Sequence, residues 1–200
     1  GNKSITANFA VNVPIVVTVH STADSGPGSL RDALTATNAN PGSDSIKFTT
    51  SGTINLLSPL PLLADQITII GATNGSGAPL VTLQPSSTFT SNPALPDGLQ
   101  LSGVFLGWGY TPQGTTIGGF AIRNFPGAGI CIEGSNNRVE GCVITGNGGD
   151  GVCIEDGNGN TIGGTQPGAG NIISNSGGNG VVVRRVNAPV PPSRNAILSN

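Results

Sequence analysis

Charged side chains are scarce in this sequence and make up 9 % of its 200 residues. A helical protein needs many Glu, Lys and Arg residues on its solvent face, so helix is expected to be a minor part of the fold. Lys and Arg number 8 against 10 Asp and Glu and form no basic stripe, which argues against nucleic acid or an anionic membrane surface as a partner. No apolar run reaches about 18 residues, so we expect no direct membrane insertion.

Histidine, tryptophan and tyrosine each occur once. The single histidine, His20, ends a Val-Thr-Val-His run, and an isolated histidine in a strand is more often structural than catalytic. One histidine excludes zinc sites built from several histidines, and no Ser-His-acid constellation is present. Paired glycines such as Gly163-Gly164 are not followed by the Lys-Ser/Thr of a phosphate-binding loop.

Glycine is plentiful, at 32 residues, and the sequence from Gly98 onward repeats itself about every 22 residues. The apolar residues of one repeat are Ile117, Ile122, Ile130 and Ile132, and they recur 22 positions later as Val139, Ile144, Val152 and Ile154. An insertion within 163–170 follows, after which the pattern resumes at Ile173, Val181 and Val183. A period of this length predicts stacked structural units that share one core.

Each repeat contains three short segments typical of strands. The first has the form Gly-φ-x-φ, where φ is apolar, at 98–101, 129–132, 151–154 and 180–183. The second lies at 120–122, 142–144, 171–173 and 196–198, and the third surrounds Ile117, Val139 and Ile162. Three strands per repeat, separated by Gly and Asn corners that tolerate positive φ, predict an all-β fold: a parallel β-helix, or solenoid, with coils of about 22 residues.

The N-terminal half carries the signal of a short amphipathic helix over 29–38. Ser29 and Asp32 form a capping box, and Pro41 lies just beyond the end. The predicted buried face consists of Leu30, Ala33, Leu34 and Thr37. We expect this helix to cap the first strands of the solenoid, which are predicted at 46–48, 53–57 and 67–70.

Residues 21–34 read Ser-Thr-Ala-Asp-Ser-Gly-Pro-Gly-Ser-Leu-Arg-Asp-Ala-Leu. Together with 44–48, 57–61 and 67–71, they resemble the amino-terminal cap of a family of bacterial secreted right-handed parallel β-helix proteins with a pectate-lyase-like fold. The repeats around 160–164 and 170–174 are similar to that family too. The resemblance implies a right-handed β-helix over about residues 17–200, with a capping region over about 17–50, in a secreted or cell-surface protein.

Both ends of the sequence carry further expectations. Residues 1–10 resemble the closing strand of a bacterial surface β-repeat module, so residues 1–16 are expected to end a preceding module or to form a linker strand. Asn200 stops in the middle of a predicted coil. Subunits that stack end to end, or that donate the strand 7–19 to a neighbour, would form an extracellular filament.

Repeat alignment gathers polar residues at one corner of the predicted solenoid. The residue after the second φ is Ser102, Glu133, Glu155 and Arg184 in turn, and Gly103, Gly134, Asp156 and Arg185 come next. Insertions at 103–113 and 186–194 flank this corner as the walls of a groove would. Three interpretations stay open: a surface charge ladder, a glycan-binding groove, and a catalytic carboxylate pair. The third is considered because stacked strands place carboxylates about 4.8 Å apart, near the roughly 5 Å that separates the catalytic pair of retaining glycosidases.

Two further features bear on ligands of this corner. Trp108 and Tyr110 lie in the first insertion, where they would either stack on a sugar or fold back onto the protein. The segment 156–160 reads Asp-Gly-Asn-Gly-Asn, which resembles a calcium loop but lacks the distant Glu of one. We therefore expect a Gly/Asn corner and no metal or other cofactor there, with calcium as the alternative.

The three cysteines cannot all pair with one another. Cys131 and Cys153 occupy the same position one repeat apart, so stacked strands would bring them about 4.8 Å from each other. Two arrangements stay open for them, a disulfide or an unbonded ladder. Cys142 aligns with Phe120 and is predicted to pack in the core.

These observations predict a non-catalytic structural or adhesive domain of a secreted or cell-surface bacterial protein. Its expected partners are extracellular glycans, a host or neighbouring cell surface, or further copies of itself. The first alternative is a polysaccharide-binding or polysaccharide-degrading protein. It would use Glu133, Glu155, Asp156 and Arg184 for chemistry, and Trp108, Tyr110 and Arg185 as further glycan contacts. The second alternative is the filament subunit.

Overall fold

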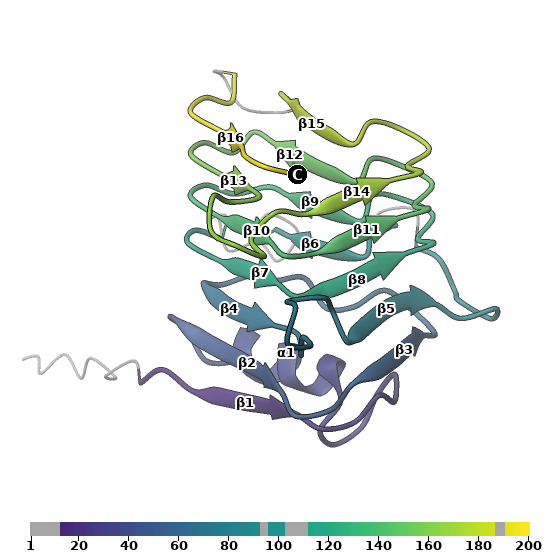
Figure 1. The fold of residues 1–200 in the computed structure, drawn as a ribbon. Coiled ribbons are helices and arrows are strands. Elements are labelled where there is room, and N and C mark those ends of the chain that lie inside the picture. Colours follow the sequence, from purple (N-terminus) through teal and green to yellow (C-terminus); the bar gives the residue numbers. More distant parts are fainter. Residues whose placement is uncertain (1–12, 93–95, 103–111, 187–190) are drawn as a thin grey trace, which may run out of the picture.

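The computed structural model describes residues 13–92, 96–102, 112–186 and 191–200. They form three parallel sheets and one helix, α1 (Leu30–Asn38), near the N-terminal end. Figure 1 shows the strands stacked in chain order, from β1 at one end to β16 at the other. Within these ranges, no helix is long and apolar enough to cross a membrane.

The three sheets draw their strands from the chain in turn. The seven-stranded sheet has the order β1 (Val16–Val19), β2 (Asp44–Phe48), β4 (Ile67–Ile70), β7 (Thr116–Gly118), β10 (Arg138–Glu140), β13 (Thr161–Ile162) and β16 (Ala196–Ile197). The five-stranded sheet has β3 (Gly52–Leu56), β5 (Val81–Pro85), β8 (Phe120–Arg123), β11 (Val143–Thr145) and β14 (Ile172–Ser174). The four-stranded sheet has β6 (Leu99–Leu101), β9 (Ile130–Ile132), β12 (Val152–Glu155) and β15 (Val181–Arg184).

Strand register follows the sequence repeat. Val139 in β10 pairs with Ile117 in β7 on one side and with Ile162 in β13 on the other. The predicted register is also kept across the 163–170 insertion: Val152 in β12 pairs with Val181 in β15. The alignment predicted for these positions is therefore confirmed.

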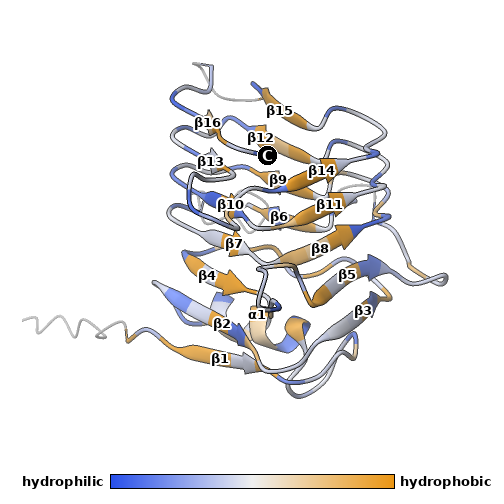
Figure 2. Ribbon diagram, viewed as in Figure 1, coloured by the Kyte–Doolittle hydropathy of each residue, from blue (hydrophilic) through white to orange (hydrophobic). Residues whose placement is uncertain are grey.

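Inward-facing apolar side chains form one hydrophobic core that runs from Val19 to Ile162. Figure 2 shows the apolar strands that surround it in orange. Phe120 packs edge to face against Phe48, with ring centroids 5.3 Å apart. Cys142 is buried in the same core, as predicted, and burial raises the pKa of its thiol to about 12. This cysteine is therefore a packing residue rather than a reactive thiol.

Helix α1 begins where the capping signal predicts. The Ser29 hydroxyl accepts a hydrogen bond of 3.2 Å from the backbone N–H of Asp32, which satisfies a free donor of the first turn. The buried residues of the helix are Leu30, Ala33, Leu34 and Thr37, the predicted apolar face. Through this face α1 packs against β1 and β2 at the start of the stack.

Glycines that lead the strands are required by close contact between repeats. A Cβ on Gly129 would lie 2.8 Å from the carbonyl oxygen of Gly151, and a Cβ on Gly151 would lie 2.5 Å from that of Gly180. The corner residues Asn124 and Asn136 do have positive φ, as expected. Conformational freedom thus explains the corners, whereas the absence of a side chain explains the motif glycines Gly98, Gly129 and Gly151. Gly180 is under no such constraint, because a Cβ there would meet only Ile173 Cγ2, at 3.9 Å.

Buried asparagines connect successive repeats in a ladder. The backbone N–H of Thr115 donates to Oδ1 of Asn137 at 2.9 Å, that of Asn137 to Asn160 at 2.8 Å, and that of Asn160 to Asn195 at 2.8 Å. In return, the Asn160 side-chain amide donates to the carbonyl of Gly134 at 2.8 Å. Much of the asparagine content therefore satisfies buried backbone groups rather than allowing positive φ.

β1 starts at Val16, one residue before the predicted start of the β-helix domain, and pairs with β2 of the same chain. At the other end of the stack, one prediction is corrected. The segment 196–198 was predicted in the sheet of β8 and β11, but β16 pairs with β13 through Ile162 and Ile197. The insertions at 163–170 and 186–194 lie between Ile162 and Ile197 and lengthen this repeat. Counting residues from the earlier repeats therefore assigns the strand to the wrong sheet.

Candidate functional site

A pocket of about 380 Å³, here called the polar groove, opens over the four-stranded sheet. Its polar lining consists of Asp97, Gln100, Glu133, Asp150, Glu155 and Arg184, and its floor includes Cys131 and Cys153. The strands β6, β9, β12 and β15 contribute residues that alternate away from the core. The groove therefore collects outward-facing groups from successive repeats, as the sequence alignment predicts.

A disulfide between Cys131 and Cys153 lies at the groove floor. The two residues pair in register on β9 and β12, with Cα atoms 4.7 Å apart. Ala128 and Val182 pack against them in a small second apolar cluster. Of the two arrangements left open by the sequence, the structure has the disulfide.

Glu133 follows β9 and is held by two neighbours from the preceding repeat. The buried Ser102 hydroxyl donates to Glu133 Oε2 at 2.7 Å, and the Gln100 side-chain amide donates to Oε1 at 3.4 Å. The side-chain carbonyl oxygen of Gln100, Oε1, is buried and accepts no hydrogen bond from the described residues. The groove thus contains a fixed carboxylate beside an unused acceptor.

Glu155 and Arg184 pair in register on β12 and β15 and carry the ion-pair network of the groove. Arg184 Nε donates to Glu155 Oε1 at 2.9 Å, and Arg184 Nη1 lies 3.2 Å from Asp150 Oδ2. Asn179 fixes Asp150 from the other side through its backbone N–H at 2.8 Å. The hydrogen bonds that Arg184 donates to Glu155 raise the pKa of Arg184, and the charges of Glu155 and Asp150 add to this effect.

Asp97 is a groove residue that the sequence prediction missed. Its Oδ1 accepts a hydrogen bond of 2.6 Å from the backbone N–H of Ala128. The pKa of Asp97 is raised to about 6, chiefly by burial. The negative charges of Glu155 and Glu133 contribute to this rise, whereas the Ala128 hydrogen bond and Arg184 oppose it. Asp97 can therefore hold a proton at a pH close to 6.

A sequence signal for Asp97 and Asp150 existed. The residue before the glycine of each Gly-φ-x-φ motif is Asp97, Ala128, Asp150 and Asn179 in successive repeats. These residues therefore form a second polar column beside the one that was predicted. The prediction considered only residues after the strand and so recovered half of the groove.

Several predicted site residues lie outside the groove or outside the described residues. Asp156 has positive φ, and its Oδ1 accepts a hydrogen bond of 2.8 Å from the backbone N–H of Val186. Arg185 is exposed and does not line the groove. Trp108 and Tyr110, with most of the first insertion, lie outside the described residues. The structure therefore brings together Glu133, Glu155 and Arg184 of the predicted set.

The proposed calcium loop at 156–160 uses its side-chain oxygens for contacts between repeats. Asn158 Oδ1 accepts a hydrogen bond of 2.7 Å from the backbone N–H of Ser193, and Asn160 Oδ1 accepts one from Asn137. Ser193 lies in the following repeat and Asn137 in the preceding one, so these two oxygens serve opposite neighbours. This geometry favours the corner over the calcium site.

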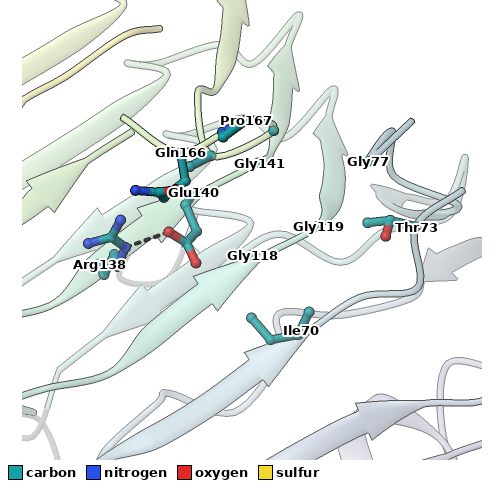
Figure 3. A pocket seen from close by; sticks show the side chains of 12 residues that line it. Ile70, Thr73, Gly77, Gly118, Gly119, Arg138, Glu140, Gly141, Gln166 and Pro167 are labelled. Atoms are coloured by element: carbon teal, nitrogen blue, oxygen red, sulfur yellow. Dashed lines mark hydrogen bonds and ion pairs between the residues drawn. The ribbon is translucent and has the colours of Figure 1, made fainter. Parts of the chain in front are cut away.

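A larger pocket of about 430 Å³ lies between the 163–170 insertion and strands β4, β7 and β10 (Figure 3). Figure 3 shows Arg138 and Glu140 joined by an ion pair, with Gln166 next to them and Thr73 across the space. The rest of the lining is largely glycine. Its two charged groups neutralise each other, so the polar groove, with several carboxylates, is the stronger candidate for chemistry.

No protein-family model matches the sequence, and no curated protein is similar enough to count as a match.

Proposed function

We propose that this chain is a right-handed parallel β-helix that serves as a rigid structural or adhesive domain of a secreted or cell-surface protein, without catalysis. The observation that carries the proposal is the register of the three sheets, in which each repeat continues the strands of the one before it. The asparagine ladder and the disulfide add links between the same repeats. Such an array resists bending because every layer is joined to the next on all sides.

The charges of the groove support a structural role. Arg184 contacts both Glu155 and Asp150, and Glu133 is occupied by Ser102 and Gln100. Side chains of successive repeats that are joined in this way by ion pairs and hydrogen bonds form a charge ladder along the stack. A ladder of this kind keeps the outer face of the sheet polar and discourages association with other sheets.

Hydrogen exchange and a substrate screen test this function together. We expect slowly exchanging amides in all three sheets, lost in one cooperative transition. We also expect wild type and Glu155→Gln to leave neutral and uronate polysaccharides intact. Sheets that exchange independently would contradict the rigid array. Products released by wild type but not by Glu155→Gln would contradict the absence of catalysis.

A glycan-binding groove is the second candidate, because Gln100 Oε1 is buried there without a donor among the described residues. Sugar hydroxyls are donors that could satisfy it. Calorimetry with neutral oligosaccharides tests this candidate in wild type and Gln100→Leu. Gln84→Leu is the matched control, since Gln84 accepts a hydrogen bond from Arg123 outside the groove. Binding that only Gln100→Leu abolishes would support the candidate, and equal binding by all three proteins would contradict it.

A further inference from the structure

We infer that Cys131, Cys153 and Glu155 form a redox-dependent binding site for a thiolate-preferring divalent cation such as Zn²⁺. The oxidised protein holds the two sulfur atoms as a disulfide, and the reduced protein offers them as ligands. This site goes beyond the structural role proposed above and does not depend on it.

The three side chains already lie together at the groove floor. One ligand atom from each, the two Sγ atoms and a Glu155 carboxylate oxygen, all lie within 4.8 Å of one another. Two thiolates bound to one tetrahedral Zn²⁺ at about 2.3 Å each are about 3.8 Å apart. Cys131 and Cys153 sit in register with Cα atoms 4.7 Å apart, so rotation of the side chains can reach that separation without moving the strands.

Glu155 is prepared for the role of third ligand. Cys153 and Glu155 are two residues apart on β12 and therefore point to the same face of the sheet. Both hydrogen bonds from Arg184 to Glu155 are accepted by Oε1, and none of the described residues donates to Oε2. A ligating carboxylate that is itself hydrogen-bonded is the usual outer-shell arrangement of metal sites. Arg184 also compensates the single negative charge left by two thiolates, one carboxylate and a divalent ion.

The redox step has a defined balance. A dithiol reductant breaks the disulfide, supplies two electrons and two protons to the protein sulfurs, and leaves as its own disulfide. The cation then displaces the two thiol protons to water and binds both thiolates. Since both cysteines line the polar groove, ion and reductant approach from that side. The fourth coordination position faces the groove and is filled by water.

Cobalt titration of the whole chain tests the site. The protein is reduced with dithiothreitol, freed of reductant without air, and titrated with Co²⁺, whose thiolate complexes absorb light by charge transfer. We expect one Co²⁺ per reduced chain with that absorption, displacement by Zn²⁺, and no such complex in the oxidised chain. Circular dichroism establishes that the reduced chain keeps its sheets. A reduced chain that unfolds, or that gives no charge-transfer band, overturns the inference.

Matched variants assign the ligands. Cys142→Ser removes a core thiol and should leave Co²⁺ binding unchanged, whereas Cys131→Ser should abolish the two-thiolate spectrum. Glu155→Gln should weaken binding by about tenfold or more, since loss of an outer-shell partner alone has that effect. Glu133→Gln changes a groove carboxylate outside the ligand set and serves as its control. Equal weakening by the two glutamine variants would remove Glu155 from the site.

Discussion

The backbone N–H of Asn137 donates a hydrogen bond of 2.8 Å to the side-chain oxygen of Asn160, one repeat further along the chain. Both asparagines are fully buried, so water cannot replace this contact. Each asparagine acts as acceptor for the repeat before it and donates to a carbonyl there as well. The ladder therefore provides hydrogen-bond partners for backbone N–H and C=O groups that the corner buries inside the protein.

Replacement of Asn160 by alanine should be strongly destabilising. The change leaves the N–H of Asn137 and the carbonyl of Gly134 buried without partners, at a cost of about 2–4 kcal/mol in the free energy of unfolding. Denaturant unfolding measures this cost. Asn55→Ala, at an exposed asparagine, should stay within about 0.5 kcal/mol of wild type. Similar losses in the two variants would mean that the ladder contributes nothing specific.

Gly151→Ala should destabilise the stack for a steric reason. The new Cβ would lie 2.5 Å from the carbonyl oxygen of Gly180, so the two repeats must move apart, at about 1–3 kcal/mol. Gly75→Ala is the control, because a Cβ there meets nothing within 4 Å. Thermal unfolding of both variants compares them. A Gly151→Ala protein as stable as the Gly75→Ala protein would show that the strand-leading glycine is replaceable.

The sequence predicted the parallel strand pairing well, because the repeat determines which residues are neighbours. Once Ile117, Val139 and Ile162 are aligned, parallel pairing and the buried face follow from strand geometry. Two features could not be predicted from the sequence. A strand-leading glycine looks the same whether it needs positive φ or close packing, and the short β16 was placed by counting across insertions of unknown path.

The candidate site was recovered in part for a related reason. Glu133, Glu155 and Arg184 follow their strands and share one column, which the alignment exposes. Asp97 looks like an ordinary turn residue in Pro-Asp-Gly, and its raised pKa depends on burial that only the folded chain provides. The cysteine column was recognised, but its distance to Glu155 is a property of side chains that sequence spacing does not give.

The raised pKa of Asp97 predicts a pH dependence of stability. The folded protein holds the Asp97 proton up to about pH 6, whereas the group has a pKa of 3.8 when unperturbed. The stabilising contribution of the protonated form is complete below pH 3.8 and is lost as the pH rises through about 6. Wild type should therefore lose stability across this window relative to Asp97→Asn, which keeps an oxygen for the Ala128 N–H. Urea unfolding at a series of pH values measures the difference, and parallel curves for the two proteins would contradict the assignment.

Arg184→Gln should raise the pKa of Asp97 still further. Arg184 lowers that pKa, while Glu155 and Glu133 raise it, so removal of the guanidinium leaves the two negative charges unopposed. The free energy of unfolding should change by less than about 1 kcal/mol at neutral pH, because the Arg184 side chain is 48 % exposed and its ion pairs are screened by water.

Titration of the Asp97 carboxyl carbon by nuclear magnetic resonance measures the pKa shift directly. Arg185→Gln removes the same charge one residue away, outside the groove, and should leave the titration almost unchanged. Equal shifts in the two variants would mean that Asp97 responds to net charge alone rather than to the groove geometry, in which Arg184 bridges Glu155 and Asp150.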